Sequence, residues 1–461
     1  MKIQFPAHHR AESTNLTLTS IIKPTSSENA MNESTHNTNQ QPQPGSPNFV
    51  SRRHFIQSAA ALSSLAGVTT SAVAADDAGK DKSRTPLNQS LGQDYVVVTQ
   101  VPDENHFIHD PAMTILPNGH LIVAAPVWGR KNKNRAVVVS RSKDGGKTWT
   151  KVCEKPWSEA TLYVHEGRLY MFTQIEIFQG VWVSASDDEG TSWTEPVEVI
   201  KADPARKHWN IQHGMVVKDG WLYWGNGRAW DDMGVVACEL KQGLLNPEAW
   251  IASEAVVMPI PQEIMSGTFS DGAQMRCLEG NVVHVGGRLL VIARAVINRY
   301  ATANMAAVFD VTREGRTLKL TFTQLYPVPG GQCKFHIVWD ERSQLFWMAS
   351  NYPTNSLGLY SDPELKLPPG KPEWQSLRED RRLLMLSYSL DALNWFPACS
   401  IAKAEKMTQS FMYPSMVIDG DDIALLSRTG RDSGDYHDAD LATFHRVRNF
   451  RSLAMDIRPK L

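Results

Sequence analysis

Short apolar runs separated by turn-forming residues characterise the chain from about residue 95 to its end. Apolar and β-branched residues gather in runs of five or six positions, such as Tyr95 to Gln100, Leu121 to Pro126 and Leu289 to Ala293, and Gly, Asp and Asn stand between the runs. Runs of this length between turn residues are typical of β-strands. No stretch keeps the apolar period of an amphipathic helix, about 3.6 residues, over a useful length. The pattern therefore predicts an all-β fold.

A short motif recurs within this strand pattern. Ser142 to Trp149 reads S-x-D-x-G-x-T-W, Ser186 to Trp193 repeats it, and Ser389 to Trp395 is a shortened third copy. In a hairpin turn of this kind, the Ser and Asp side chains bind turn amides, Gly accepts a positive φ and Trp packs between neighbouring sheets. We therefore expect a structural rather than a catalytic role for the motif.

The spacing of the motif predicts a β-propeller. Trp149 and Trp193 are 44 residues apart, which is the length of one four-stranded blade. Six blades would take about 64 residues each and seven would take about 55, and both lengths suit propeller repeats. We expect six blades, with seven as the alternative, and we expect the run Leu441 to Val447 to close the ring against the first blade.

Composition narrows the choice of ligands. The chain has 461 residues, is 42% hydrophobic and carries 47 Lys and Arg against 49 Asp and Glu, so it lacks the basic excess that a nucleic-acid partner requires. Its five Cys are widely spaced and form no C-x-x-C pair, which predicts neither a disulfide framework nor a zinc cluster. Because no nucleotide or metal-binding motif is present either, we expect no cofactor and no metal.

The N-terminal part of the chain is predicted to be an export signal. Residues 1–50 are rich in Ser, Thr, Asn, Gln and Pro and are expected to be disordered. The pair Arg52-Arg53 then precedes an uncharged stretch that ends in Ala72-Val73-Ala74, which indicates a twin-arginine signal peptide over 51–74. This stretch is too short and too rich in Ala and Ser for a stable membrane span. We expect a periplasmic or extracellular protein, with a linker over 75–94 and the propeller over 95–461.

Together, the repeated motif, the propeller-sized chain and the export signal resemble the sialidase (neuraminidase) superfamily, whose repeats are called Asp-boxes or BNR repeats. Glu279-Gly280-Asn281-Val282-Val283, followed by Gly287-Arg288-Leu289-Leu290 and Arg294, is similar to one blade of that family. Tyr413-Pro414-Ser415-Met416, followed by Ile423-Ala424-Leu425-Leu426, is similar to the strand that carries the nucleophile. The resemblance covers roughly residues 95–430.

The resemblance implies roles for several residues. Tyr413 would be the nucleophile, which suits an anomeric carbon that already bears a carboxylate, and Glu279 would accept the proton of the Tyr413 hydroxyl. Arg294 would bind the carboxylate of the substrate, because a planar guanidinium meets a carboxylate through two hydrogen bonds. A second such arginine is expected at Arg381 or Arg382, just ahead of the third motif copy.

The chain also departs from the family pattern. His109, in His109-Asp110-Pro111, stands where the first carboxylate-binding arginine is expected, and the segment 128–135 lacks the carboxylate expected of the acid/base residue. Asp110 could take the acid/base role only if the pocket is rearranged. The polar segment 428–440 adds Arg428 and His437 as further candidates for substrate binding.

Three hypotheses follow, and a carbohydrate is the ligand in each. The first is an exported exo-sialidase-like glycoside hydrolase that removes a terminal acidic sugar, such as sialic acid, from glycans. The second is a polysaccharide lyase or atypical glycosidase acting on uronic-acid polysaccharide, with His109 and Tyr413 transferring protons. The third is a glycan-binding propeller without turnover, which the loss of the first arginine and of the acid residue favours.

Overall fold

The computed structural model describes the chain between residues 94 and 458, with several gaps. The described residues are 94–131, 134–177, 179–202, 208, 213–227, 232–259, 276–296, 304–354, 380–406, 409–431 and 437–458. All of them belong to the second of two compact units, Asp76–Leu461. The predicted disordered segment (1–50) and the predicted signal peptide (51–74) lie outside the described residues.

Six antiparallel sheets, named blades 1 to 6, account for nearly all the described strands. Blade 1 contains β2 (His106–Ile108), β3 (Ala112–Ile115), β4 (Leu121–Gly129), β5 (Arg135–Ser142) and β6 (Thr150–Lys155). Blade 2 contains β7 (Glu159–His165), β8 (Arg168–Gln174), β9 (Val181–Ser186) and β10 (Val197–Ile200). Blade 3 contains β11 (Met215–Lys218), β12 (Trp221–Gly225), β14 (Val235–Glu239) and β15 (Trp250–Ala252).

The remaining blades follow in chain order. Blade 4 contains β17 (Arg276–Val285), β18 (Arg288–Val296), β19 (Met305–Glu314) and β20 (Thr317–Pro327). Blade 5 contains β21 (His336–Asp340), β22 (Leu345–Asn351), β23 (Leu383–Ser389) and β24 (Phe396–Lys403). Blade 6 contains β25 (Ser410–Asp419), β26 (Asp422–Gly430), β27 (Leu441–Val447) and β1 (Val96–Gln100). The other described elements are the strand pair β13 (Asp232–Met233) and β16 (Val256–Val257) and the short 3-10 helices η2 (Leu240–Gln242), η3 (Pro247–Ala249) and η6 (Phe450–Leu453).

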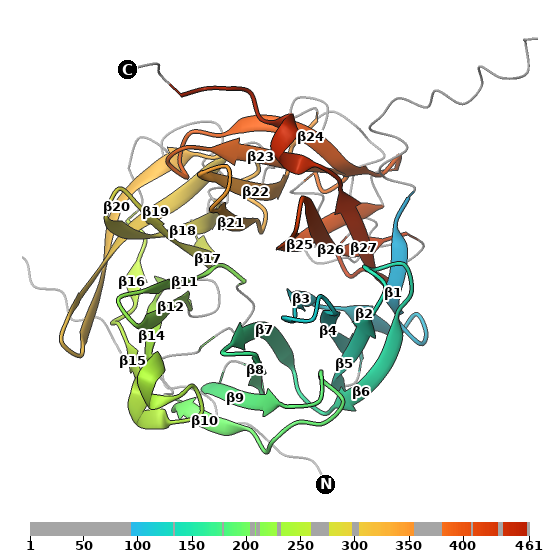
Figure 1. The fold of residues 1–461 in the computed structure, drawn as a ribbon, viewed down its shortest axis with the longest axis horizontal. Coiled ribbons are helices and arrows are strands. Elements are labelled where there is room, and N and C mark those ends of the chain that lie inside the picture. The colour runs from blue at the N-terminus through green and yellow to red at the C-terminus, as the bar shows by residue number, and fades with distance from the viewer. Residues whose placement is uncertain are drawn as a thin grey trace, which may run out of the picture. The chain divides into compact units, whose positions relative to one another are not determined.

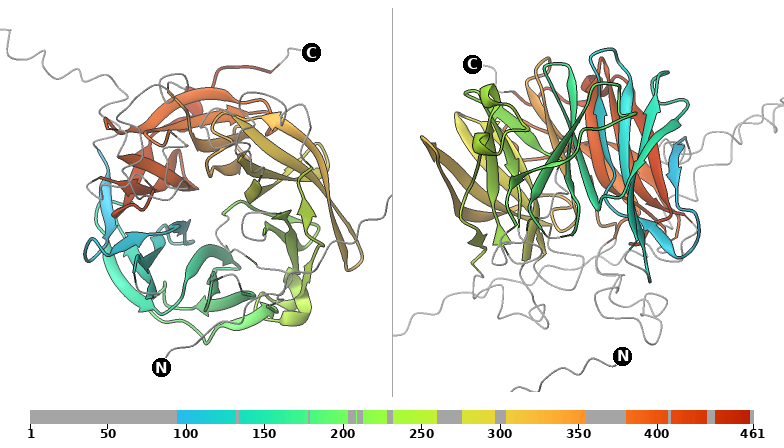
Figure 2. Two further views of the ribbon diagram at one scale, coloured as in Figure 1. Left: turned by 180° about the vertical axis from the view of Figure 1, so that it is seen from behind. Right: turned by 90° about the horizontal axis from the view of Figure 1, so that it is seen from below.

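The blades surround one axis, so the described part of the chain is a six-bladed β-propeller, as predicted (Figure 1). The view from behind shows the same ring, and the view from below shows many of its strands running from one face of the ring to the other (Figure 2). The ring closes in blade 6, where β1 pairs with β27 and becomes the outermost strand. β27 therefore pairs with β1, the first strand of the described residues, but inside the last blade and not against the sheet of blade 1.

The apolar core lies between the blades. Each of the six pairs of adjacent blades encloses its own cluster of buried side chains, and the largest of these contain Trp224, Trp347 and Phe309. A blade therefore buries both of its faces, which explains why strands such as β4 and β22 are apolar along almost their whole length instead of alternating. Each blade depends on two neighbours for its stability.

The recurring motif builds the turns between third and fourth strands. In its first copy, Ser142 Oγ accepts a hydrogen bond from the Gly146 amide at 2.8 Å, and Asp144 Oδ1 accepts one from the Thr148 amide at 2.9 Å. The second copy has the equivalent bonds, with lengths of 2.9 and 2.7 Å. Gly146 has a φ of 90°, which a residue with a Cβ adopts only with strain. Trp149 packs on Phe444 of blade 6, so this turn also joins the first and last blades.

Candidate active site

Three inner strands are interrupted, and each interruption holds residues that the sequence singled out. The inner strand of blade 1 is broken between β2 and β3, where His109 and Asp110 lie. The pairing of β17 and of β25 shifts at a bulge, and the bulged residues Glu279 and Tyr413 have left-handed φ angles of 57° and 51°. A bulge redirects a side chain, and such a backbone costs about 1–3 kcal/mol in a residue other than glycine. The fold therefore accepts local strain at the positions that direct these side chains toward the axis.

Tyr413 is the residue around which the cationic groups gather. Arg294 Nη1 lies 3.5 Å from the Tyr413 hydroxyl oxygen and 3.1 Å from Oε2 of Glu279. The guanidinium carbons of Arg381 and Arg428 lie 5.2 and 5.0 Å from the centroid of the Tyr413 ring. Blades 4, 5 and 6 thus each bring one buried arginine to the same tyrosine.

The electrostatics of this group keep the tyrosine protonated in the unliganded protein. Burial raises the pKa of Tyr413 and the nearby Glu279 adds to the effect, against the lowering influence of Arg381, Arg294 and Arg428. Burial also raises the pKa of Glu279, with Arg294 as the main opposing charge. Glu279 and Tyr413 share Nη1 of Arg294, so a proton leaving the phenol has an acceptor at the same guanidinium.

Arg428 has unused hydrogen-bonding capacity. Its side chain is fully buried, and Nε and Nη1 have no hydrogen-bond partner among the described residues. Only Nη2 approaches a carboxylate, Oδ1 of Asp438, at 3.4 Å. Asp438 is held more firmly by Arg130 Nη1 at 3.0 Å and by His437 Nδ1 at 2.8 Å. Two buried guanidinium nitrogens without hydrogen-bond partners are costly, and an anionic ligand would compensate for that cost.

The structure distinguishes between the adjacent Arg381 and Arg382. Arg381 is 3% exposed, lies over the Tyr413 ring and donates through Nη1 to the sulfur of Met412 at 2.8 Å. Arg382 instead binds the buried Asp380 through two hydrogen bonds, Nε to Oδ1 and Nη2 to Oδ2, each 3.0 Å long. Of the two, Arg381 is therefore the one placed to meet a ligand, whereas Arg382 neutralises a buried carboxylate.

His109 forms a buried pair with an acid that the sequence did not single out. Its Nδ1 lies 3.1 Å from Oε2 of Glu159, at the start of β7, and its ring stacks on Trp128 at a centroid distance of 3.8 Å. Burial lowers the pKa of His109 to about 3, and the positive charge of Arg428 contributes. The imidazole is therefore neutral, and its Nδ1 hydrogen is donated to the carboxylate.

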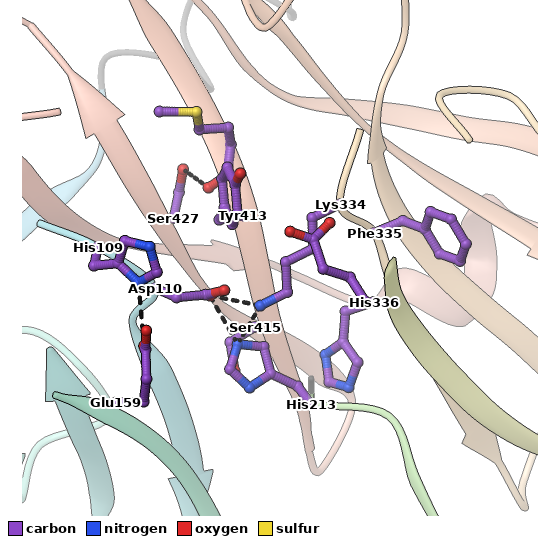
Figure 3. Close-up of polar contacts among 12 residues, drawn as sticks. His109, Asp110, Glu159, His213, Lys334, Phe335, His336, Tyr413, Ser415 and Ser427 are labelled. Carbon is purple, nitrogen blue, oxygen red and sulfur yellow. Dashed lines mark hydrogen bonds and ion pairs between the residues drawn. The ribbon is translucent and has the colours of Figure 1, made fainter. Parts of the chain in front are cut away.

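Asp110 lies beside a buried lysine. Lys334 Nζ, which comes from the segment before β21, is 2.5 Å from Oδ1 of Asp110 and 3.0 Å from Nε2 of His213 (Figure 3). Asp110 is fully buried, and its second oxygen, Oδ2, has no hydrogen-bond partner within the described part of the chain. Burial raises the pKa of Asp110, and the Lys334 charge opposes this effect. The site thus contains a buried carboxylate with one oxygen bonded to Lys334 and the other without a hydrogen-bond partner among the described residues.

His437 lies at the edge of the cluster. Its ring is edge-on to Tyr413 at a centroid distance of 6.3 Å, and its Nδ1 bonds to Asp438. Burial and the nearby Arg428 lower the pKa of His437 to about 4, so this imidazole is also neutral near neutral pH. His437 therefore positions Asp438, which in turn lies against Arg428.

Lys334, Glu159 and Trp128 are the site residues that the sequence analysis did not identify. A signal exists only for Lys334, which stands alone between the apolar Cys333 and Phe335 just ahead of a strand. A single cation in an apolar run is buried with it and requires a partner. Glu159 and Trp128 belong to no recognisable pattern, because their positions in the site depend on contacts between blades.

Neither a membrane-spanning helix nor a metal-binding group of side chains is found among the described residues. None of the helices there is long and apolar enough to cross a membrane. No group of three or more His, Cys, Asp or Glu side chains in the same residues is arranged to hold a metal ion.

Comparisons with known proteins found similarity only among solved structures, since no family model and no curated protein matches the chain. A Dyadobacter fermentans protein of unknown function is 14% identical, with a TM-score of 0.48, over 77% of this chain and 98% of its own. The Penicillium chrysogenum alpha-L-arabinanase in complex with arabinobiose is 12% identical, with a TM-score of 0.46, over 77% and 98%. The Trypanosoma rangeli sialidase in complex with sialic acid is 14% identical, with a TM-score of 0.48, over 75% of this chain and 54% of its own. At such low identity, the function of this chain has to be inferred from its own site.

Proposed function

We propose that this protein is an exported glycoside hydrolase of the sialidase type that removes a terminal acidic sugar from glycans. The observation that carries the proposal is the buried hydroxyl of Tyr413, which lies beside the Glu279–Arg294 pair and close to two further buried arginines. A nucleophile surrounded by guanidinium groups suits a sugar that brings its own carboxylate to the reacting carbon.

The three arginines would bind the carboxylate of the sugar. Arg294, Arg381 and Arg428 approach Tyr413 from different parts of the ring, and Nε and Nη1 of Arg428, which have no hydrogen-bond partner among the described residues, are donors that an anion could meet. His109 cannot supply a positive charge in place of the expected first arginine, because burial keeps its pKa near 3. Arg428, from β26, would take over that role from the other side of the closure between blades 6 and 1.

Tyr413 would act as nucleophile in two displacements. Its hydroxyl oxygen attacks the anomeric carbon while Glu279 takes the phenol proton, which the raised pKa of Tyr413 would otherwise retain. A water molecule then attacks the same carbon, and the proton returns from Glu279 to the departing phenolate. Two inversions give overall retention of the anomeric configuration.

Asp110 would be the acid/base residue. Its free Oδ2 could donate a proton to the leaving oxygen in the first displacement and accept one from water in the second. Burial supports the protonated form that the first step requires, since it raises the pKa of this carboxyl. Asp110 would thereby take the acid/base role that was expected of a carboxylate in segment 128–135.

The test is release of a fluorophore from a synthetic α-sialoside by the purified protein, with Tyr413→Phe as the matched variant. We expect turnover by the wild type, loss of at least about 10³-fold in Tyr413→Phe, and initial release of the α-anomer by proton NMR. Turnover that survives in Tyr413→Phe, or release of the opposite anomer, would contradict the proposed nucleophile. Binding of acidic glycans without any turnover would instead support a non-catalytic, glycan-binding propeller.

A lyase or atypical glycosidase acting on uronic-acid polysaccharide is the second candidate, and the His109–Glu159 pair favours it. A neutral imidazole fixed by a buried carboxylate and stacked on Trp128 has the form of a proton-transfer group. A lyase leaves a conjugated uronate that absorbs ultraviolet light. This absorbance should rise when the wild-type protein acts on uronate polysaccharide alone, with no sialoside added, and should not rise with His109→Gln. That result would favour this candidate over the first.

Export by the twin-arginine route is part of the proposal and has its own test. Replacing Arg52 and Arg53 together by Lys should retain the protein in the cytoplasm of a bacterial host that has this pathway, whereas the unchanged chain should reach the periplasm. Fractionation followed by immunoblotting measures the distribution. Equal periplasmic amounts of both proteins would argue against this signal.

A further inference from the structure

Lys334 is a buried lysine that the proposed reaction does not use. Its side chain is 1% exposed, although ammonium groups are rarely buried without a specific partner. Nζ lies 2.5 Å from Oδ1 of Asp110 and 5.6 Å from the centroid of the Tyr413 ring. The ammonium group therefore contacts the candidate acid/base residue and lies near the candidate nucleophile.

Two neighbouring histidines, His213 and His336, hold this lysine in place and are themselves uncharged. His213 binds the backbone of Pro111 and presents Nε2 to Lys334 at 3.0 Å. His336 binds the backbone of His213, and its Nδ1 accepts the Met416 amide hydrogen at 2.9 Å. Burial lowers the pKa of both histidines well below the usual value, so neither is charged near neutral pH. The histidines thus act as a neutral frame for the ammonium group.

We propose that Lys334 is a positioning residue that sets the proton affinity of Asp110, an inference that rests on the proposed function. In the first displacement the Asp110 proton moves to the leaving oxygen, the bond from that oxygen to the anomeric carbon breaks, and a carboxylate remains. A fully buried carboxylate without a cation is costly. An ammonium group already in contact with Oδ1 stabilises it without reorganisation. In the second displacement the carboxylate takes a proton from water and returns to its starting form.

Other charged and titratable groups also face Asp110. His109 and Arg428 approach from blades 1 and 6, His213 from the segment before β11, and Glu279 from blade 4. Neither His109 nor His213 is charged near neutral pH, and Glu279 is paired with Arg294. Lys334 is the cation that bonds directly to the Asp110 carboxyl group, so its removal should have the largest effect on this proton.

The pH dependence of kcat/KM tests the inference. Asp110 must be protonated for the first displacement, so the rate falls as the pH rises through its pKa. Lys334→Met removes the cation, which should move this alkaline limb upward by about 1–3 pH units and lower the maximal kcat/KM at least about 10-fold. Lys334→Arg keeps the charge and should leave the limb close to that of the wild type. Lys241→Met, at an exposed lysine paired with Glu239, is the matched control and should change neither quantity.

Two additional measurements separate a positioning role from a purely structural one. In an Asp110→Asn background, Lys334→Met should cost little further activity, because its effect acts through Asp110. Carbon NMR of the Asp110 carboxyl should show a higher pKa in Lys334→Met than in the wild type, whether or not a substrate has been found. If Lys334→Met does not fold, Lys334→Gln carries the same expectations. An unchanged limb and an unchanged carboxyl pKa would overturn the inference, whereas a failed sialoside assay with a shifted carboxyl pKa would overturn only the proposed function.

Discussion

Arg381 and Arg382 offer a sharp test, because two adjacent residues of one type have different surroundings. Arg381 lies over the Tyr413 ring, and Arg382 is bound to the buried Asp380. We therefore expect Arg381→Met to reduce activity with little loss of stability, and Arg382→Met to reduce stability with little loss of activity. Each variant serves as the control for the other.

The expected magnitudes come from the contacts that each change removes. A bidentate pair with a substrate carboxylate consists of two charge-assisted hydrogen bonds of about 1.5–3 kcal/mol each, so Arg381→Met should lower kcat/KM by about 10² to 10⁴. Removing one partner of a buried ion pair costs about 3–5 kcal/mol. Because Arg382 is itself 23% exposed, solvent reduces this cost, and we expect about 2–3 kcal/mol for Arg382→Met.

Urea unfolding at two pH values tests whether the stability difference between the wild type and Arg382→Met grows or shrinks with pH. Burial alone would raise the pKa of Asp380, but hydrogen bonds from Arg382 and Thr354 outweigh it and hold the pKa below its usual value. A lowered folded-state pKa gives stability that is present above the unfolded pKa and is lost as the pH falls through the folded one. In Arg382→Met the carboxyl is buried without its cation and favours the protonated form. The difference in unfolding free energy between wild type and variant should therefore narrow from pH 7 toward about pH 4.

The reverse pattern would refute this reasoning. If Arg382→Met abolished turnover at unchanged unfolding free energy while Arg381→Met remained active, the carboxylate would bind at the other arginine. A stability difference that is the same at both pH values would show that Asp380 is not the partner through which Arg382 acts.

Three further outcomes are expected. Arg428→Met should lower kcat/KM at least about 10²-fold. Its free energy of unfolding in urea should fall by no more than about 1 kcal/mol, because Asp438 still bonds to Arg130 and His437; a large loss of stability would contradict this. Gly146→Ala places a Cβ 2.1 Å from a ring atom of Phe444 at a φ of 90° and should lower the free energy of unfolding by about 2–4 kcal/mol. Gly119→Ala, with open space around its Cβ, should lower it by about 1 kcal/mol; equal losses would show that the clash with Phe444 is not the cause. No disulfide joins any of the five Cys, all of which lie among the described residues, so a reducing agent should leave the thermal midpoint of unfolding unchanged.

The parts of the fold and site that follow from local pattern were predictable. The runs that became β4 and β18, and the motif turns ending at Trp149 and Trp193, depend on neighbouring residues in the chain. The number of blades was predicted from the length of the chain and the motif spacing, and the structure has six. Tyr413 became a candidate in a similar way, because the residues around it resemble a strand of a known family.

The site residues that the sequence did not predict owe their positions to contacts with residues far away along the chain. The residues in the Lys334–Asp110 pair are 224 positions apart, and those in the His109–Glu159 pair are 50 apart, so no local window contains both partners. The register of Arg381 and Arg382 was ambiguous for another reason. Both precede β23, outside the strand alternation that would assign one of them to each face.

The pairing of β1 with β27 has a consequence for the order in which the chain is made. β1 leaves the ribosome first, but its partner is synthesised more than 300 residues later, so its edge stays open through most of synthesis. Arg428 of blade 6 lies over the Phe107 ring of blade 1 and close to Asp110, across the junction between the last and first blades. A partly synthesised chain consequently lacks part of the candidate site, and the proposed activity would report that both ends of the propeller have been made and joined.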